Sequence, residues 1–328
     1  MRLIQQFLDR VVFVLVKLWV MAHAYRHWKD LRKRLKKKGV KQVRVVVPLR
    51  GDEKFFWRKV FDHDPRFVTL SDKIACKDWV AAEGIAVQTP KTLWVGTDAN
   101  DIPDALWHQP SYLKASHGYN MNIAVLSPPA DRAAVIAQAN AFVDKEHGRK
   151  ANQWAYRHVE RRLLLEEALF VDQPMIEIKY YTNGPIVEQF VISRHGPPTS
   201  GARWVRNIDG GYELDPTPTM HGPNIDTNPL PPAVETGLAL AKEIGSRFDQ
   251  IRVDTMTDGE TLYLGEITVY SIAGRIHHYG HLVSTPLNRS WDLRRSWFLT
   301  VKQPWPWCLY AHALRRALDR REARLFAK

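Results

Sequence analysis

The chain has 328 residues, of which 45% are apolar and 25% charged, a balance that is typical of folded globular proteins and excludes a disordered chain. This length exceeds what one compact core usually organises, so we expect two or three lobes. The 47 Lys and Arg residues against 35 Asp and Glu give a net charge of +12, which favours an anionic partner: a nucleotide, a nucleic acid, an acidic glycan or an anionic membrane.

Residues 1–48 are predicted to form an amphipathic, basic N-terminal extension. Their apolar run is interrupted by Lys17 and falls short of the roughly 20 mostly apolar residues that a spanning helix needs. Six basic residues between Arg32 and Lys38 follow. Such a helix ahead of a polybasic stretch is typical of peripheral contact with an anionic membrane, and the alternative is a helix docked on its own domain with a solvated basic face. The positions that recur at helical spacing and predict one apolar face are Leu3, Ile4, Phe7, Leu8, Val11, Val12, Leu15, Trp19 and Ala22.

The middle of the chain mixes short strands and helices without a strict β-α alternation, which favours an α+β fold with antiparallel sheets. In the helix expected at 71–84, Ser71 is the predicted N-cap and Gly84 the residue that ends it. Asn183-Gly184 is the turn signal of a β-hairpin. We expect strands at 43–47, 89–96 and 163–169, helices at 71–84, 130–148 and 235–248, and hairpins at 175–193 and 251–267.

The stretch at 113–126 carries Lys114 and a Ser-His-Gly-Tyr-Asn loop between two sheet-like runs. An ammonium group at a strand end beside a glycine-containing loop can meet phosphate oxygens, and the loop N–H groups add anion-binding dipoles. Lys179, on the first hairpin, could serve in the same way. Each lysine alone is more often a surface residue, and it is the order of the elements along the chain that favours the functional interpretation.

Asp254 and Glu266 stand on the two strands of the second hairpin, and the turn length decides whether they cooperate. An odd-numbered loop around Asp258-Gly259, with Gly259 at positive φ, would put both carboxylates on one face at near-diagonal positions, about 7–8 Å apart between backbones. They could then share Mg²⁺, which binds one or two carboxylates together with phosphate oxygens. An even-numbered loop would separate them, leaving two acids on a solvated hairpin. Arg252, on the same face as Asp254, is a further phosphate candidate.

The order of these elements resembles the TupA-like ATP-grasp proteins of bacterial capsule and exopolysaccharide biosynthesis, over residues 50–275. Its most specific parts are the helix that opens with SDK at 71–73 and the KxxHG element at 114–118. The resemblance implies an ATP-grasp fold, in which two α+β lobes with antiparallel sheets clamp a nucleotide. The implied segments are an N-terminal extension at 1–48, an N-terminal subdomain at 49–110, a first lobe at 111–170, a second lobe with the metal hairpin at 171–285, and a basic, Trp-rich tail at 286–328.

The resemblance also implies ATP and Mg²⁺ as cofactors. Lys114 matches the lysine that contacts phosphate. The residues from Glu166 to Leu169 match the segment that supplies adenine contacts through its backbone and a carboxylate to the ribose. The metal ligands implied are Asp254, Glu266 and Thr268. The implied nucleotide-binding residues are Lys73, Lys114, His117, Gly118, Glu166, Glu167, Ala168, Leu169 and Lys179, and the catalytic candidates are Lys114, Lys179 and Arg252.

The implied activity is an ATP- and Mg²⁺-dependent carboxylate–amine ligase that works through an acyl phosphate. Its implied acceptor is an acidic surface polysaccharide or a lipid-linked precursor, met in the cytoplasm at the inner face of the plasma membrane. Two departures leave other functions open: Tyr119-Asn120 stand where the family tends to have Ser-Gly, and Thr268 stands where many ATP-grasp enzymes have Asn. They favour a catalytically inactive scaffold in a polysaccharide assembly complex as one alternative. A sugar-hydroxyl phosphotransferase on the same nucleotide site is another, because the acceptor pocket is the part least readable from the sequence.

Other chemistries find little support in the sequence. Cys76 and Cys308 are too few for a disulfide framework, and no CxxC or HExxH spacing suggests zinc. Asp62-His63-Asp64 is the nearest approach to the DxD element of a glycosyltransferase, but it precedes a proline and is interpreted as structural. The Trp-rich C-terminus suits a bilayer interface or a stacking platform for nucleic acid, and nucleic acid is not favoured because no recognisable binding module accompanies it.

Overall fold

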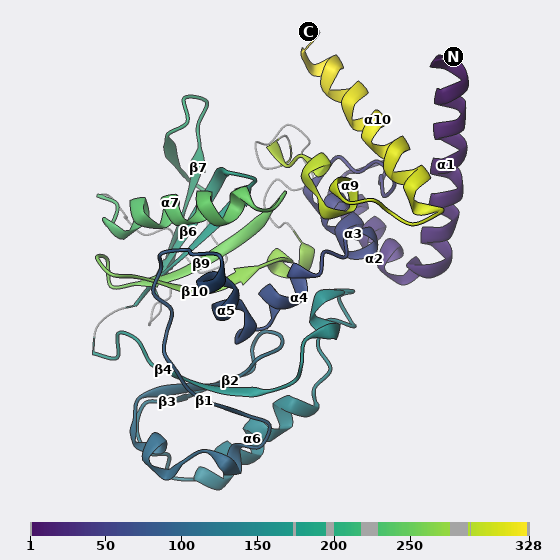
Figure 1. Cartoon of the computed structure of the whole chain (residues 1–328). Coiled ribbons are helices and arrows are strands. Elements are labelled where there is room, and N and C mark those ends of the chain that lie inside the picture. Colours follow the sequence, from purple (N-terminus) through teal and green to yellow (C-terminus); the bar gives the residue numbers. More distant parts are fainter. Residues whose placement is uncertain are drawn as a thin grey trace. The chain divides into compact units, whose positions relative to one another are not determined.

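The computed structural model describes residues 2–172, 175–194, 200–217, 229–275, 288 and 290–326. They form two compact units (Figure 1). The first unit draws on Met1–Asp64, Ala151–Trp154 and Tyr270–Lys328, and the second on Pro65–Lys150 and Ala155–Val269. This division does not follow the five segments expected from the sequence, because the two ends of the chain belong to one unit.

The first unit is helical and has an aromatic core. Trp57 Nε1 donates a hydrogen bond of 2.7 Å to the Tyr310 hydroxyl, which donates one of 2.7 Å to the Val46 carbonyl. The strand predicted at 43–47 is wrong: Val45 and Val46 are buried in this core as an irregular segment, with a tyrosine hydroxyl in place of a sheet partner. The helices of this unit are α1 (Arg2–His23), α2 (Tyr25–Lys37), α3 (Gly51–Phe61), η4 (Ser271–Gly274), η5 (Leu293–Arg295), α9 (Trp297–Thr300) and α10 (Trp307–Phe326).

Helix α1 has two apolar faces, whereas the sequence predicted one. Val12 and Trp19, which were expected in the same stripe as the leucines, pack inward with the buried Val20. On this inward side the Asp9 carboxylate pairs with Arg316 of α10 at 2.6 Å. Most of the predicted stripe lies on the other face and is exposed. No helix within the described ranges is long and apolar enough to cross a membrane.

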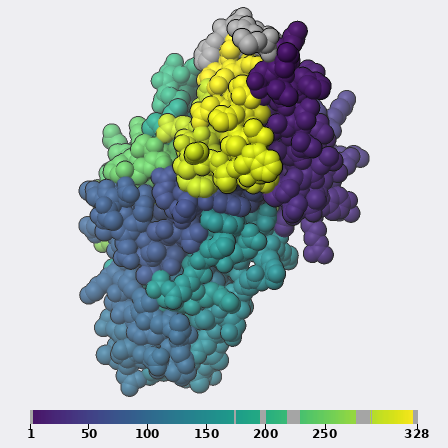
Figure 2. Space-filling model, turned by 45° about the vertical axis from the view of Figure 1, so that its right-hand side comes forward, coloured from purple at the N-terminus to yellow at the C-terminus, as the bar shows by residue number. Residues whose placement is uncertain are grey.

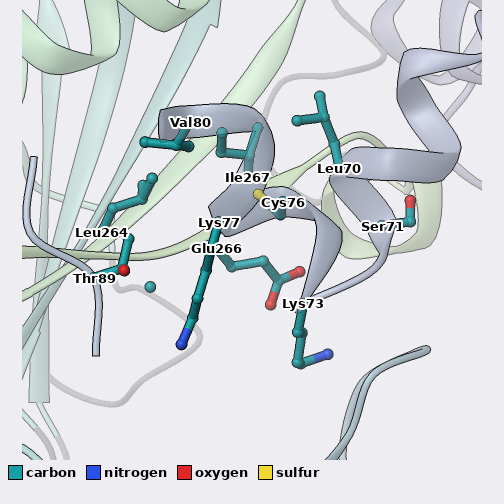
Figure 3. Close-up of a pocket in the computed structure, with 11 residues that line it drawn as sticks. Leu70, Ser71, Lys73, Cys76, Lys77, Val80, Thr89, Leu264, Glu266 and Ile267 are labelled. Carbon is teal, nitrogen blue, oxygen red and sulfur yellow. The ribbon is translucent and has the colours of Figure 1, made fainter. Parts of the chain in front are cut away.

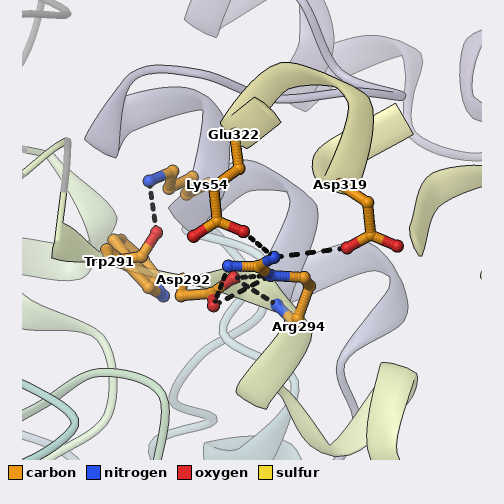
Figure 4. A network of polar contacts seen from close by, with 6 residues as sticks. All are labelled: Lys54, Trp291, Asp292, Arg294, Asp319 and Glu322. Carbon is orange, nitrogen blue, oxygen red and sulfur yellow. Dashed lines mark hydrogen bonds and ion pairs between the residues drawn. The ribbon is translucent and has the colours of Figure 1, made fainter. Parts of the chain in front are cut away.

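A polar network ties α10 to the segment before it (Figure 4). The Arg294 guanidinium contacts Asp319 at 3.2 Å and also pairs with Glu322, both on α10. Nearby, the Lys54 ammonium donates to the Trp291 carbonyl at 2.5 Å. These contacts hold the C-terminal helix against the core of the first unit.

The Asp62-His63-Asp64 motif is structural, as predicted. Asp62 is fully buried, and its Oδ1 accepts the N–H of Phe298 at 2.8 Å. The His63 ring stacks on Trp154 with a centroid distance of 4.6 Å. A carboxylate committed to a backbone amide inside a core is not a metal–nucleotide ligand.

The second unit contains two wholly antiparallel sheets, with strand orders β1-β4-β2-β3 and β10-β9-β5-β6-β7-β8. The predicted α+β class with antiparallel sheets is confirmed, and the architecture matches what the ATP-grasp resemblance implies. The elements are α4 (Arg66–Ser71), α5 (Ala75–Ala82), β1 (Thr92–Gly96), η1 (Ala99–Asp101), η2 (Asp104–His108), β2 (Ser111–Ala115), β3 (Asn122–Val125), α6 (Arg132–Asp144), η3 (Ala155–His158), β4 (Leu163–Glu167), β5 (Ile176–Asn183), β6 (Ile186–Arg194), β7 (Ser200–Arg206), β8 (Tyr212–Asp215), α7 (Ala233–Ser246), β9 (Ile251–Thr257) and β10 (Leu262–Thr268).

The helix predicted at 71–84 begins later than expected and has a different cap. Ser71 is the last residue of α4, and α5 begins only after Ile74. The Asp72 carboxylate takes the capping role, since its Oδ1 accepts the N–H of Ile74 at 2.9 Å. Gly84, with φ +68, follows the end of the helix as predicted.

Helix α7 covers one face of the six-stranded sheet (Figure 1). Tyr180 of β5 meets Gly237 of α7 so closely that a Cβ at the glycine would lie 2.1 Å from the tyrosine hydroxyl oxygen. Because side chains alternate along a strand, Glu177 and Lys179 project to the opposite face. That second face carries the candidate site.

Candidate functional site

Three adjacent strands present polar side chains on the sheet face away from α7. Lys179 on β5 pairs in register with Asp254 on β9, which pairs in turn with Glu266 on β10. Two residues further along each strand, Arg252 on β9 pairs with Thr268 on β10. Since directly opposed residues of antiparallel strands project to the same face, these five side chains form one polar surface.

A β-bulge at Gly265 brings Glu266 opposite Asp254. The register of the β9–β10 ladder shifts by one residue between Leu264 and Glu266, so Gly265 is an extra residue on β10. Without the shift, Glu266 would pair with Val253 and project to the other face of the sheet. The bulge therefore decides that the two carboxylates meet.

The length of the hairpin turn is not what brings the two carboxylates together. It has four residues, Asp258 to Thr261, between the paired Thr257 and Leu262, and Gly259 has φ +117 as expected. The prediction that an odd-numbered loop is needed to bring the carboxylates together was wrong, because the bulge supplies the one-residue shift. The carboxylates are directly opposed and not diagonal.

Arg252 holds the Asp254 carboxylate from the same strand. Its Nε and Nη2 donate to the two carboxylate oxygens, each at 2.6 Å, and Nη2 also donates to the Thr268 hydroxyl at 3.0 Å. That hydroxyl donates to Glu266 Oε1 at 3.1 Å. Burial raises the pKa of the Asp254 carboxyl, and the guanidinium opposes this by favouring the carboxylate. Burial lowers the pKa of the Arg252 guanidinium, but Asp254 outweighs it and raises that pKa, so the guanidinium stays protonated.

The two opposed carboxylates fit a magnesium ion. Among the described residues, no group of three or more His, Cys, Asp or Glu side chains is arranged to hold a metal ion. Mg²⁺ is commonly bound through one or two carboxylates together with substrate phosphates and water. Asp254 and Glu266 supply two carboxylates, with the Thr268 hydroxyl beside them. An ion here would be held jointly by these residues and a bound polyphosphate.

Lys114 lies at the end of a strand, as predicted. It is paired with Asn122 across the β2–β3 ladder, on either side of the glycine-containing loop. Its ammonium forms an ion pair with Glu166 of β4, which also pairs with Lys77 of α5 at 2.5 Å. Burial raises the pKa of the Glu166 carboxyl, but the two lysines outweigh it and hold the pKa below its ordinary value. Glu166 is thus a carboxylate shared by two ammonium groups.

A cavity of about 410 Å³ brings these groups together within the second unit. One side is lined by Lys73, Lys114, Glu166 and the loop residues 118–122, and the other by side chains of β5, β9 and β10. A site with the Lys73 and Lys114 ammonium groups on one side and the Asp254 and Glu266 carboxylates on the other suits a polyphosphate with its metal ion. The predicted site residues that line this cavity are Lys73, Lys114, Gly118, Glu166, Asp254 and Glu266.

The loop beside the cavity is shaped by Gly118 and held by Lys73. The Lys73 ammonium donates to the Gly118 carbonyl at 2.5 Å, and the Lys73 backbone N–H donates to the Ser116 carbonyl at 3.0 Å. Gly118 has φ +88, and a Cβ there would lie 2.5 Å from the His147 ring. Any other residue would be strained at this φ, and its Cβ would displace the His147 side chain. Burial lowers the pKa of the Lys73 ammonium.

His117 anchors this loop and does not line the cavity. Its side chain is buried, with Nε2 3.0 Å from the Lys145 carbonyl oxygen. Because a carbonyl can only accept, Nε2 is the nitrogen that donates. Burial lowers the pKa of His117 and of the neighbouring His147, which favours neutral rings. The nucleotide contact predicted for His117 gains no support from its position.

Four other predicted residues are not among the described residues that line the cavity. Lys179 forms an ion pair with Glu177. Glu167 Oε1 accepts a backbone N–H ahead of β1 at 2.7 Å, and the Ala168 N–H donates to a backbone carbonyl ahead of β2 at 3.0 Å. Leu169 is half-buried. Their nucleotide contacts stay predictions.

A smaller hollow lies between α5 and β10 (Figure 3). The Glu266 side chain projects on the same side as Lys73 and Lys77, and Lys73 and Glu266 line both hollows. Cys76 also lines it, and burial raises the pKa of its thiol to about 12. Such a thiol is protonated and inert, as expected of a structural cysteine.

Two charged residues of the site were missed by the sequence analysis. Lys77 contacts Glu166, and Glu177 lines the cavity. Lys77 follows Lys73 at i+4, the spacing that puts two residues on one helix face. Glu177 precedes Lys179 by two, the period of a strand. Both spacings were visible in the sequence.

No protein-family model and no curated protein sequence matches the chain. Among solved structures, it is similar to a D-alanine–D-alanine ligase from Bacillus anthracis complexed with ATP, with TM-score 0.37 and 18% identity over 69% of this chain and 68% of the ligase. It is similar to an L-amino acid ligase from Bacillus licheniformis, with TM-score 0.41 and 12% identity over 80% of this chain and 57% of the ligase. It is also similar to an N5-carboxyaminoimidazole ribonucleotide synthetase in complex with ADP, with TM-score 0.35 and 15% identity over 65% of this chain and 47% of the synthetase. Similarities at these TM-scores cover only part of the backbone path, and we assign no residue a role from them.

Proposed function

We propose that the chain binds ATP and Mg²⁺ in the cavity and uses them for carboxylate–amine ligation, as an ATP-grasp enzyme. The observation that carries the proposal is a single cavity lined by Lys73 and Lys114 and by the opposed carboxylates Asp254 and Glu266. Lysines can neutralise phosphate oxygens, and the carboxylates can hold the metal ion that bridges them. The resemblance of the motif order to TupA-like ATP-grasp proteins supports the same conclusion.

In the proposed reaction, an oxygen of the acceptor carboxylate attacks the γ-phosphorus of ATP, and ADP leaves. An amine then attacks the acyl carbon, an amide bond forms, and phosphate leaves. Mg²⁺ would neutralise charge on the transferring phosphoryl group. Arg252 favours the ionised form of Asp254 and orients it through its bidentate contact. Lys114 is paired with Glu166, so phosphate oxygens would compete with that carboxylate for the ammonium.

We further propose that the acceptor is an acidic surface polysaccharide or its lipid-linked precursor, met on the cytoplasmic side of the plasma membrane. The net charge of +12 and the family resemblance support a polyanionic acceptor. Phosphoryl transfer to a sugar hydroxyl would use the same nucleotide site, so the product distinguishes the two reactions.

The test is calorimetric titration of ATP into the wild type and Asp254→Asn, with and without Mg²⁺. We expect metal-dependent binding in the wild type and its loss in the variant. Asp209→Asn, at an exposed position between β7 and β8, is the matched control and should bind like the wild type. ADP release that requires both a carboxylate and an amine identifies the ligase, and a stable phosphorylated sugar without amine identifies the phosphotransferase. No binding to the wild type would overturn the proposal and favour an inactive scaffold.

A further inference from the structure

The N-terminal helix carries an exposed apolar row that the candidate site does not use. Eight large apolar side chains between Leu3 and Leu18 are each at least 41% exposed, among them Leu3 at 81% and Phe7 at 65%. At the spacing of an α-helix they fall within one arc of about 140°. A contiguous row of this kind marks an interaction surface, unlike single exposed apolar residues.

The exposed row is not the side of α1 that packs against the rest of the first unit. The opposite face buries Val16 and Val20, and its Asp9 pairs with Arg316 of α10. The Trp19 ring meets Trp307 at a centroid distance of 4.7 Å. Helix α1 therefore lies beside α10 at the surface (Figure 2), held by its inner face with the outer row left open.

Basic side chains lie along one flank of the row, and an exposed tryptophan belongs to the same unit. Arg10 and Lys17 are exposed and seven residues apart, so they lie on one flank of α1. The following helix, α2, buries Leu31 and Leu35 and exposes a series of Lys and Arg side chains to solvent. Trp305, two residues before α10, is 80% exposed. Apolar, basic and tryptophan side chains together are the composition of a bilayer interface.

We propose that the outer face of α1 docks the first unit on an anionic lipid bilayer. The helix lies in the interface plane, with its apolar row among the acyl chains and Arg10 and Lys17 at the level of the headgroups. The positive charge of this region favours a lipid bilayer over a second copy of the chain as the partner of this face. A second copy of the chain carries the same positive charge along α1 and α2, whereas anionic headgroups complement it. This inference stands independently of the nucleotide site.

The test is co-sedimentation with vesicles of phosphatidylcholine alone and of an equimolar mixture of phosphatidylcholine and phosphatidylglycerol. We expect the wild type to bind the mixed vesicles, and to bind them more weakly at high salt. Phe7→Ser/Leu15→Ser should lower the partition coefficient at least about tenfold, because two apolar side chains no longer enter the acyl region. Ile208→Ser, at a position 98% exposed in the second unit, should bind like the wild type.

Circular dichroism of each variant shows whether the fold is retained, and Mg-ATP binding by the double variant should equal that of the wild type. Equal vesicle binding by the double variant and the wild type would overturn the inference. The same holds if the wild type stays in the supernatant when mixed vesicles are present. Light scattering tests whether a second copy of the chain binds this face instead. A wild-type dimer that Phe7→Ser/Leu15→Ser converts to monomer, with no vesicle binding, would assign the face to a second copy.

Discussion

Glu266 on β10 lies directly opposite Asp254 on β9 because the bulge at Gly265 shifts the strand register by one residue. The pair presents two carboxylates on one face of the sheet, and both line the same cavity. Such a pair binds a divalent ion with a polyphosphate more strongly than either carboxylate alone.

Replacing one of these carboxylates should therefore weaken metal binding. We expect Glu266→Gln to lower the affinity for Mn²⁺ in the presence of ATP by at least about tenfold, since even indirect partners of metal ligands contribute this much. Electron paramagnetic resonance of free Mn²⁺ measures the change. Glu260→Gln, exposed at the tip of the same hairpin, is the control and should leave the affinity unchanged. Equal affinities in the two variants would exclude Glu266 as a metal ligand.

Arg252 and Asp254 should behave as one unit in stability measurements. Removing one partner of a mostly buried ion pair leaves the other charge uncompensated, which costs about 3 kcal/mol. We expect Arg252→Ala and Asp254→Ala each to lose this much in urea unfolding. The double variant should lose clearly less than the sum, because no unpaired charge remains. Additive losses would mean that the bidentate contact does not stabilise the fold.

Local patterns in the sequence predicted the elements that carry the site. The strand, loop and strand around Lys114 and the hairpin carrying Asp254 and Glu266 are signalled by apolar runs and turn residues close in sequence. The α+β class followed from the same local patterns. In both segments one strand pairs with the strand that follows it in sequence, so local sequence contains much of the information.

The features that the sequence did not reveal depend on contacts between separate elements of the fold. The bulge at Gly265 depends on how β9 and β10 align, and a glycine in a strand run does not by itself specify a register shift. Lys77 reaches Glu166 only because the fold brings α5 beside the four-stranded sheet. The run at 43–47 has strand composition, but aromatic residues from distant segments bury it in a helical core. Tertiary packing overrides local propensity there.

Gly118 should tolerate a side chain far less well than Gly84 does. Both have positive φ, +88 and +68, so alanine costs about 1–2 kcal/mol of backbone strain at either position. At Gly118 the added Cβ would also lie 2.5 Å from the His147 ring, whereas nothing lies within 4 Å at Gly84. We expect Gly118→Ala to unfold at lower urea than Gly84→Ala, and to lose ATP affinity through the displaced loop.

The backbone strain is common to both glycines, so the difference between the two variants measures the effect of the contact with His147. The midpoints and slopes of the urea transitions give the two stability losses, and calorimetry gives ATP affinity. Similar losses in both variants, with unchanged nucleotide binding, would mean that the loop accommodates the methyl group and does not shape the site.

Acidification should destabilise the second unit through His117 and His147. Burial lowers both imidazole pKa values below 6.5, so the folded state favours neutral rings. Below that pH the unfolded chain binds more protons than the folded one, and the free energy of unfolding must fall as the pH falls. The thermal midpoint should therefore decrease between about pH 7.5 and pH 5.5, a window above the ordinary titration range of carboxylates.

His147→Gln should reduce the slope of this pH dependence, because glutamine does not titrate. Gln109→Asn, at an exposed position without a titratable side chain, is the control and should keep the wild-type slope. The same thermal scans at several pH values give all three slopes. A wild-type midpoint that rises on acidification would reverse the sign of the argument and show that the two rings are charged in the folded state.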